Sequence, residues 1–384
     1  MIKLWAVGNP GNLAMMYMTA LQLQQRLGLG RISNVSIPLF DIHHPDLKPE
    51  GHGLHNRLTT NNLQNGYVPL RGLAHAAEQS VPSFISLEGY SQHLANFPPR
   101  SDFDYERLFP PLESSEGGSD DELVINIRGS EILTGLHADY VLLPPEFYQY
   151  LIELTGKKPV FYGQLDPSPY LQELKERFPQ ATFIPSRGVA QDFDYLRKSR
   201  HIVPSLSTFS WLACWLSEAR TIHFPIAGVL NPQQHTLSML LPLDDPRYRF
   251  YEFPLYYSLP VAQYRDYLDP VRTNWAPVTP STVKARLPST LQHIDDQILA
   301  FSPWDYLHMH PEKDAFYRSY GDVGLYNDFM NDDLLCGRAG FTLDRAYYAR
   351  LNVGAALAVA RGEYSSLEEH YYRVGQYGGL SKRP

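Results

Sequence analysis

Residues 201–216 read HIVPSLSTFSWLACWL, and they place a short apolar strand, a turn rich in hydroxyl groups and an apolar helix in direct succession. We expect the strand over residues 201–203 and the helix over residues 210–218. Short strands that alternate with helices are typical of a parallel sheet with crossover connections. In such a sheet the strand-to-helix turn lies at the carboxyl end of the strand, which is where ligands bind.

The hydroxyl groups of this turn allow two interpretations. Ser and Thr are favoured as N-caps, so the turn can simply begin a helix, and this interpretation is favoured when the turn is considered alone. Alternatively, the first N–H groups of the helix, which have no partner within it, combine with the hydroxyls of Ser205, Ser207 and Thr208 to cradle an anion.

The same alternation extends to both sides of this segment. The predicted strands span residues 122–128, 158–164, 181–185 and 221–226, and the predicted helices span residues 145–154, 168–178 and 192–199. Ser168 is expected to cap the second of these helices. Together these elements predict a parallel sheet with crossover helices.

The beginning of the chain repeats the order strand, turn and helix. Residues 2–7 fit a buried strand, residues 8–12 read GNPGN and form a turn, and residues 13–27 carry apolar side chains at helical spacing. A further strand leads into a polar turn within residues 83–97. Residues 43–80 are rich in His, Asn and Gly and are predicted to be mostly loop.

These patterns predict an α/β fold with two Rossmann-like domains and a mainly helical C-terminal extension. The acidic segment ESSEGGSDDE at residues 113–122 is the expected flexible linker between the two domains. The expected divisions are an N-terminal α/β domain at 1–115, a second α/β domain at 116–245, an irregular Pro- and Tyr-rich connection at 246–310 and a helical C-terminal domain at 311–384.

Composition and charge restrict the possible classes of protein. With 384 residues, 43% of them apolar, the chain can form packed cores in more than one domain. Its net charge of −8 argues against a nucleic-acid coat, which needs a basic face. Cys214 and Cys336 form neither a disulfide framework nor a zinc-binding pair. Because signal-peptide and long apolar patterns are lacking, we expect a cytoplasmic protein with no transmembrane segment.

Charged residues follow the predicted strand at 122–128. Arg128 stands at its carboxyl end, and a guanidinium there suits a diphosphate because its planar fork binds two oxygens at once. Glu131, His137 and Asp139 come next and are candidates for a general base.

Two D-x-D triplets raise the question of a metal. They occupy residues 102–104 and 192–194. The first lies in a polar stretch and the second opens a predicted helix, where Asp is favoured in any case. We therefore expect no metal site.

Four short segments follow one another in the first part of the chain. They are GNPGN at 8–12, LEGYSQ at 87–92, N-x-R-x-x-E at 126–131 and SLSTFSWLACWL at 205–216. Their order and approximate spacing resemble those of the family-11 fucosyltransferases, the alpha-1,2-fucosyltransferase type. The fourth segment is the most specific of the set.

The resemblance implies a GT-B-like pair of Rossmann domains, the first on the acceptor side and the second binding a nucleotide sugar. It implies an inverting glycosyltransferase of bacterial glycan biosynthesis that transfers fucose from GDP-fucose to a hydroxyl of a glycan acceptor. Because Arg128 and the Ser207–Thr208 turn could stabilise the departing diphosphate, we expect the reaction to need neither a metal nor another cofactor.

The resemblance assigns roles by position. Arg128 would hold the GDP diphosphate and act in catalysis, together with Glu131 or Asp139 as the base. The residues implied in donor binding are Gly11, Asn12, Asn126, Arg128, Ser205, Ser207, Thr208 and Phe209.

The chain also departs from the family pattern. Asn126 stands where the family has His, Gly129 replaces its second Arg, and Glu131 replaces its Asp. Residues 162–166 read YGQLD where an Asp-containing segment is expected. Two alternatives therefore stay open, a non-catalytic glycan- or nucleotide-binding protein with a decayed transferase site and a transferase that uses another nucleotide sugar.

The C-terminal segment resembles a short domain appended to bacterial glycosyltransferases. The residues that fit its pattern are Phe341, Tyr347, Tyr348, Asn352, His370, Tyr371, Gly375 and Gly379. Packing or partner binding is the role expected of them.

Overall fold

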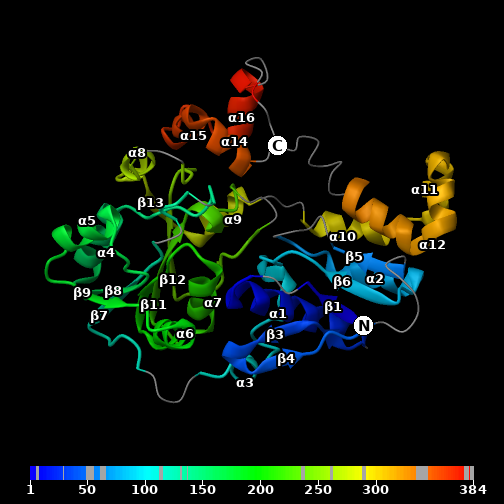
Figure 1. Ribbon diagram of the computed structural model, residues 1–384, viewed down its shortest axis with the longest axis horizontal. Helices are drawn as coiled ribbons and strands as arrows, with labels where there is room; N and C mark the ends of the chain where they lie inside the picture. The colour runs from blue at the N-terminus through cyan, green and yellow to red at the C-terminus, as the bar shows by residue number, and fades with distance from the viewer. Residues whose placement is uncertain are drawn as a thin grey trace. The chain divides into compact units, whose positions relative to one another are not determined.

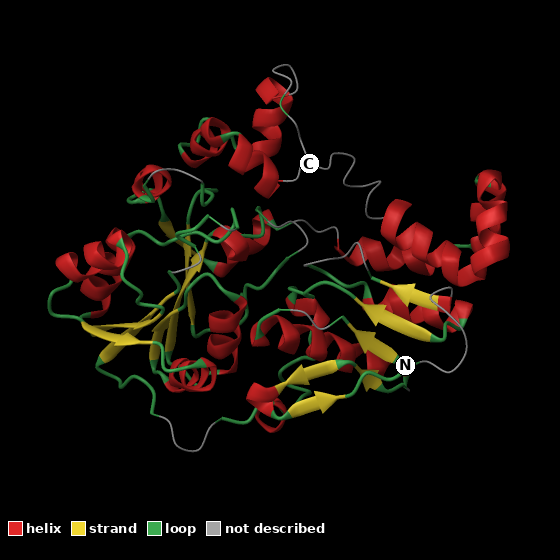
Figure 2. Cartoon of the chain, viewed as in Figure 1, coloured by secondary structure: helices red, strands yellow, loops and turns green. Residues whose placement is uncertain are grey.

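The computed structural model describes residues 1–5, 8–28, 30–48, 56–60, 66–111, 116–129, 132–135, 137–234, 238–259, 263–287, 291–333, 345–375 and 380. The chain divides into two compact units. Unit 1 comprises Met1–Phe109, Thr236–Leu240 and Leu287–Phe341, and unit 2 comprises Pro110–His235, Leu241–Arg286 and Thr342–Pro384. Each unit contains a parallel sheet with helices packed around it, so the α/β class is confirmed (Figures 1 and 2).

The sheet of unit 2 has the strand order β13-β12-β11-β10-β7-β8-β9. Its strands are β7 (Glu122–Ile127), β8 (Lys158–Gly163), β9 (Thr182–Pro185), β10 (His201–Val203), β11 (Thr221–Ile226), β12 (Tyr248–Glu252) and β13 (Ala276–Val278). Neighbouring strands are parallel except for β13, which is antiparallel to β12. The chain runs outward from β7 to β9, returns to β10 and continues to β12. The order therefore reverses between β7 and β10, as it does in a doubly wound sheet.

Crossover helices cover both faces of this sheet. They are α4 (Pro145–Thr155), α5 (Pro169–Arg177), α6 (Val189–Lys198) and α7 (Thr208–Leu216), and α4 contacts α5 while α6 contacts α7. Because crossovers are right-handed and the strand order reverses after β9, the two pairs lie on opposite faces. The central strand is consequently buried on both sides, and Leu123, Val124 and Ile125 have no exposed surface. Ser168 caps α5 as predicted, accepting a hydrogen bond from the Leu171 amide at 3.1 Å.

The sheet of unit 1 is parallel and has the order β2-β1-β6-β5. Its strands are β1 (Ile2–Leu4), β2 (Ile32–Ser33), β5 (Arg57–Thr59) and β6 (Phe84–Leu87), and a separate antiparallel pair is formed by β3 (Val35–Ile37) and β4 (Ile42–His44). Helix α1 (Pro10–Leu27) follows β1 as the sequence predicted.

The prediction of loop over residues 43–80 is wrong for part of that range. It contains β5 and helix α2 (Leu70–Ser80). Leu70, Leu73 and Ala74 lie on one buried face of this helix, a spacing that the surrounding His, Asn and Gly residues obscured. Helix α10 (Leu291–Leu299) packs on α2, and a Cβ added at Gly72 would come within 2.7 Å of Ile298.

Helix α12 (Asp314–Asp328) protects the edge strand β5 of unit 1. The Asn327 side chain accepts a hydrogen bond from the Thr59 amide at 2.8 Å and donates one to the Arg57 carbonyl at 2.7 Å. Asn331 donates to the Thr59 carbonyl at 3.1 Å. Side-chain amides thus supply the bonds that a neighbouring strand would make, which blocks pairing with another chain at this edge.

The structure divides the later part of the chain differently from the predicted segments. Residues 246–310, expected to be irregular, include β12, β13, α8 (Arg265–Leu268), α9 (Pro280–Arg286) and α10. Residues 311–384, expected to be one domain, are shared between the units, since α12 belongs to unit 1 and residues from Thr342 onward belong to unit 2. The reason is packing on earlier elements, because α10 and α12 contact α2 and β12 extends the sheet of unit 2.

The predicted linker is closely packed in its described part. A Cβ added at Gly117 would lie 2.2 Å from the Lys198 carbonyl carbon, and one at Gly118 would lie 2.3 Å from Val124. The Gly118 amide donates a hydrogen bond to the Ser199 hydroxyl at 2.9 Å. These glycines permit close backbone approach and do not act as flexible spacers.

The helices of the C-terminal segment are α14 (Arg345–Leu351), α15 (Val353–Ala360) and α16 (Leu367–His370). The Tyr348 hydroxyl lies 3.0 Å from His370 Nδ1, the Tyr371 ring packs edge-on against Tyr348, and a Cβ at Gly375 would come within 2.3 Å of the Tyr348 hydroxyl. These motif residues therefore pack against one another, as expected. Phe341 and Gly379 lie outside the described residues.

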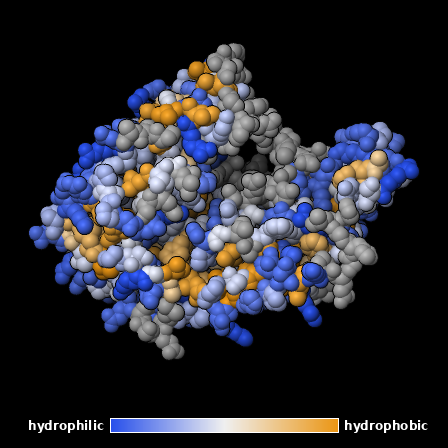
Figure 3. Space-filling model, in the orientation of Figure 1, coloured by the Kyte–Doolittle hydropathy of each residue, from blue (hydrophilic) through white to orange (hydrophobic). Residues whose placement is uncertain are grey.

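Among the residues described, no helix is both long and apolar enough to cross a membrane. Large exposed apolar side chains, such as Val81, Leu154 and Trp304, are scattered along the chain. Figure 3 accordingly shows apolar residues interspersed with hydrophilic ones on the face in view.

Candidate functional site

The candidate site of unit 2 lies where the strand order of its sheet reverses. Strands β7 and β10 are parallel neighbours, with Val124 opposite Ile202 and Ile125 opposite Val203. The segments that follow them therefore leave the sheet at the same edge. This brings Asn126 and Arg128 next to the hydroxyl turn at residues 205–208.

The serines of this turn form a buried cluster that begins helix α7. Ser207 Oγ accepts a hydrogen bond from the Ser210 amide at 3.1 Å, so the capping interpretation is confirmed. Ser210 Oγ lies 2.6 Å from both Ser205 Oγ and Ser207 Oγ. Thr208 and Phe209 form the first turn of the helix, and Phe209 packs edge-on against Phe193 of α6.

Asn126 connects this cluster to the neighbouring strand. Its Oδ1 accepts a hydrogen bond from Ser210 Oγ at 2.8 Å, and its Nδ2 donates one to the Tyr162 carbonyl at 3.1 Å. A carboxamide can do both at once because it carries a donor and an acceptor. Asn126 is buried, so it positions the ends of β7, β8 and α7 relative to one another.

Arg128 is half-buried at the end of β7 and faces an aromatic ring. Its guanidinium lies 4.4 Å from the centre of the Tyr140 ring, and the exposed His137 ring packs edge-on against Tyr140 at 5.1 Å. Arg128 and Asn126 line the same small cavity as Ser205. The site thus combines a positioned cation with the first turn of a helix, which is a favourable environment for an anion.

The predicted base residues have different surroundings. Asp139 is buried, and its Oδ1 accepts a hydrogen bond from Gln234 Nε2 at 2.7 Å. Its carbonyl also accepts a bond from the Val229 amide at 2.9 Å. Asp139 therefore holds the loop after β11 in place. Glu131 lies outside the described residues.

A second arginine at this edge was missed by the sequence reasoning. Arg187 follows β9, is exposed, and places its guanidinium 5.4 Å from the Tyr162 ring centre and 5.1 Å from that of Tyr195. Its amide donates to Asp192 Oδ1 at 2.8 Å, and the Tyr162 hydroxyl donates to the same oxygen at 2.6 Å. An arginine two residues after the predicted strand at 181–185 was the available indication.

The acidic triplets have structural partners. Asp104 caps the short helix α3 (Tyr105–Leu108), accepting a hydrogen bond from the Arg107 amide. Asp192 accepts the bonds just described, and Asp194 forms an ion pair with Lys198 at 3.0 Å. Within the described ranges, no group of His, Cys, Asp or Glu has the geometry to hold a metal ion.

The two motifs of unit 1 also meet. Strands β1 and β6 are parallel neighbours, and the residues that follow them come together at the carboxyl edge of that sheet. Gln92 Nε2 donates to Asn12 Oδ1 at 3.2 Å, and a Cβ at Gly8 would lie 3.4 Å from Tyr90. Gly11 and Asn12 are buried in the first turn of α1. These two residues belong to unit 1, whereas the other predicted donor-binding residues belong to unit 2.

Comparisons with known proteins give little additional information. No protein-family model matches the chain, and no curated protein matches it. Among solved structures, it is similar to AviGT4, a glycosyltransferase involved in avilamycin A biosynthesis, at 12% identity and a TM-score of 0.30. That match covers 88% of this chain and 98% of the other.

Proposed function

We propose that the chain is a glycosyltransferase that binds the diphosphate of a nucleotide sugar where the sheet of unit 2 reverses its strand order. The observation that carries the proposal is that Arg128 and the serine cluster that begins α7 lie at the same edge of the sheet, connected through Asn126. Ligands of open α/β sheets bind at such a point. The order of the four sequence segments favours a transferase, with GDP-fucose as the donor.

The proposed reaction is an inverting displacement at the anomeric carbon. An acceptor hydroxyl attacks this carbon, its proton passes to a base, and the bond from the carbon to the diphosphate oxygen breaks. Negative charge then develops on the leaving diphosphate. Arg128 and the N–H groups that begin α7 would stabilise this charge without a metal ion, because they are already positioned before the reaction.

The choice of base follows from burial. Asp139 is buried and bonded to Gln234, so its carboxylate is poorly placed to meet an acceptor hydroxyl. His137 is exposed and its ring packs on Tyr140. The Arg128 guanidinium contacts the same Tyr140 ring. A neutral imidazole is a suitable general base. We therefore propose His137 as the base, with Glu131 as the alternative.

The test is calorimetric titration of the full chain with GDP in the presence of a chelator. We expect Arg128→Ala to weaken GDP binding about 10- to 100-fold and Arg128→Lys to recover little, because an ammonium cannot hold two oxygens in a fixed fork. Transfer from GDP-fucose should fall about 10²–10³-fold in kcat, because the contact strengthens as charge develops.

Arg220→Ala is the matched control. Arg220 precedes β11, at the amino end of the strands, and its exposed side chain pairs with Asp120 at 3.1 Å. GDP binding should be unchanged in this variant. If Arg128→Ala binds GDP as tightly as the unaltered chain, the proposed site is wrong. GDP binding that depends on Arg128 but is accompanied by no transfer from any nucleotide sugar would favour the non-catalytic binder.

A further inference from the structure

A second cavity, of about 420 Å³, opens at the carboxyl end of β12 in unit 2. It lies on the same sheet edge as Arg128 but beside the outer strands. The residues that matter most among those lining it are Glu252, Phe253, Trp275, Arg286, Val359 and Tyr364. The volume is in the range of small-molecule sites.

One wall is an aromatic ring that is held firmly in place. The Trp275 indole packs edge-on against Phe147 and Tyr150, with ring centres 5.0 and 4.9 Å away. Its N–H donates to the Arg272 carbonyl at 3.2 Å. The ring is half-buried, so one part of it is fixed by the protein while another borders the cavity.

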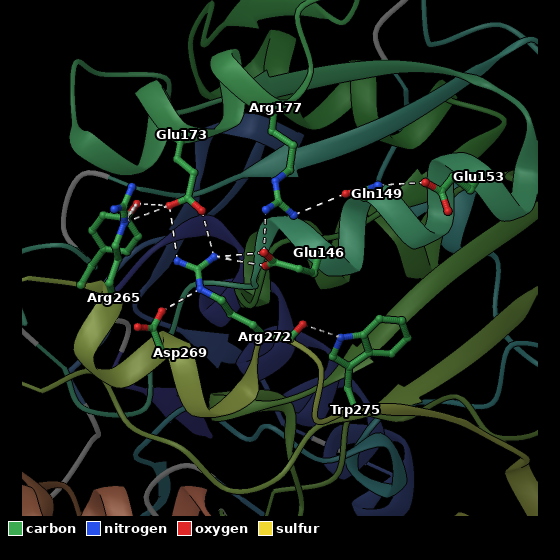
Figure 4. Close-up of polar contacts among 10 residues, drawn as sticks. Glu146, Gln149, Glu153, Glu173, Arg177, Arg265, Asp269, Arg272 and Trp275 are labelled. Atoms are coloured by element: carbon green, nitrogen blue, oxygen red, sulfur yellow. Dashed lines mark hydrogen bonds and ion pairs between the residues drawn. The ribbon is translucent and has the colours of Figure 1, made fainter.

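Arg272 itself is clamped by carboxylates from three elements (Figure 4). Its guanidinium contacts Asp269 at 2.7 Å, Glu173 of α5 at 2.9 Å and Glu146 of α4 at 3.2 Å. Only 19% of the side chain is exposed, so these contacts are screened less than surface ion pairs. The clamp fixes the loop that carries Trp275, and the wall is therefore preorganised.

The C-terminal segment supplies the opposite wall. Helix α15 contacts the turn at Asp269–Val271. Its Val359 borders the cavity together with Tyr364. The Tyr364 ring packs edge-on against His370 at 4.9 Å. His370, which also bonds to Tyr348, therefore holds the Tyr364 ring in place. The packing of the motif residues in this way shapes the cavity.

The lining combines buried apolar side chains with exposed polar ones. Phe253 and Val359 are buried, while Glu252 and Arg286 form an ion pair of 2.6 Å and are 25% and 51% exposed. Asn274 also lines the cavity. The balanced pair would attract neither anions nor cations strongly. A wholly apolar ligand would displace water from this ion pair and from Asn274 without replacing its hydrogen bonds, which costs binding energy.

A neutral saccharide satisfies all of these features at once. Its C–H face can stack on the Trp275 indole, and its adjacent hydroxyls can bond to carboxylate, guanidinium and carboxamide groups. We propose that this cavity binds a neutral sugar unit of the acceptor glycan, in unit 2 and not in the N-terminal domain expected on the acceptor side, and that the C-terminal segment serves to form one of its walls. The identification of that sugar as the acceptor rests on the proposed function, whereas the binding of sugar does not.

The experiment uses the full chain and a panel of methyl glycosides of glucose, galactose, mannose, fucose and N-acetylglucosamine. Saturation-transfer NMR identifies which of them bind, and tryptophan fluorescence gives the affinity. The titration is done in a Trp5→Phe, Trp304→Phe background, because both indoles lie outside the cavity and are exposed, 49% and 78%.

We expect Arg286→Met to weaken binding about tenfold, because the variant loses a hydrogen bond from a charged donor to a sugar hydroxyl. Its side chain is half-exposed, so the variant should fold normally. Trp275→Ala should abolish binding, and saturation-transfer NMR measures this variant because the substitution removes the fluorescent reporter. The matched control is Arg249→Met, because Arg249 is an exposed arginine of β12 that does not line the cavity. The affinity of this variant for the glycosides should be unchanged.

Two results would overturn the proposal. One is the absence of binding of every glycoside at concentrations up to about 50 mM. The other is unchanged affinity in Arg286→Met. Failure of the proposed function is distinguishable, because GDP titration of the same samples reports on Arg128 alone. Sugar binding without GDP binding would leave this cavity standing as a glycan site and remove GDP-fucose as the proposed donor.

Discussion

Ser210 and Asn126 are small residues whose hydrogen bonds connect several parts of the candidate site. Ser210 has no exposed surface, and its hydroxyl lies within hydrogen-bond distance of Ser205, Ser207 and Asn126. A buried polar group that loses its partner costs about 1–3 kcal/mol. The proposed anion site is therefore supported by a network whose members hold one another in place before any ligand binds.

At the scale of single residues, two buried histidines lead us to expect that the free energy of unfolding falls in mild acid. Burial lowers the pKa of His93 and of His223 from 6.5 to about 4. His223 Nδ1 lies 2.9 Å from the Tyr251 hydroxyl, and its Nε2 has no hydrogen-bond partner among the described residues. Between the two pKa values the unfolded chain binds a proton that the folded chain does not. Stability therefore rises with pH across this window and falls as pH drops from 6.5 towards 4.

The loss between pH 7 and pH 5 should be about 2 kcal/mol for each histidine. Urea unfolding at both pH values measures it. His223→Gln should reduce the difference between the two pH values, even if it lowers stability at both. His43→Gln, at an exposed position, should leave the difference unchanged. An equal pH dependence in all three proteins would contradict the assignment.

At the scale of elements, the end of β8 determines how closely the strands of the site approach. Gly163 has a φ of +120°, and a Cβ there would lie 2.5 Å from the Ile127 carbonyl oxygen and 2.9 Å from Asn126 Nδ2. The position thus requires glycine for two separate reasons, its backbone conformation and the space beside it. Any side chain here would displace the end of β7, which carries Asn126 and leads to Arg128.

Gly163→Ala is therefore expected to lower both stability and GDP binding. Strain at such a φ costs about 1–3 kcal/mol, and the displaced strand end should add to it. Gly156→Ala separates the two causes, because Gly156 has a φ of +63° but nothing within 4 Å of an added Cβ. This control should lose some stability and keep GDP binding. Chemical denaturation and calorimetry measure both, and unchanged GDP binding in a folded Gly163→Ala protein would count against the site.

At the scale of the whole molecule, the chain builds each unit from segments that are distant in sequence. Helices α10 and α12 complete unit 1, where they contact α2, and Asn327 of α12 protects the edge of β5. Residues from Thr342 onward return to unit 2 and form a wall of its second cavity. Each unit therefore depends on residues that follow the other in the chain.

Two truncations test this dependence. A chain ending at Arg286 lacks α10 and α12, so the apolar face of α2 and the edge of β5 become exposed, and we expect unit 1 to unfold or aggregate. A chain ending at Asp333 retains these helices, and unit 1 should stay protected while the glycan cavity loses its wall. Limited proteolysis with mass spectrometry of the Met1–Phe109 region distinguishes them. Equal protection in both truncations would show that the helices are not needed.

Local patterns were enough to predict most elements of unit 2 and the role of Ser207. Strands such as β7 are continuous apolar runs because both faces of the sheet are covered, and that signature depends only on neighbouring residues. A cap is equally local, since Ser207 bonds to an amide three residues away. The position of Arg128 at a strand end follows from the same information.

What depended on contacts between distant residues could not be predicted in this way. The neighbouring positions of β7 and β10, the bonds of Asn126 to Ser210 and Tyr162, and the approach of Tyr364 to the cavity that Trp275 lines all arise from strand order and helix packing. The division of residues after 286 between the units has the same origin. Local sequence specifies which faces are apolar, but several surfaces can cover a given face, and only the packing of the complete chain selects among them.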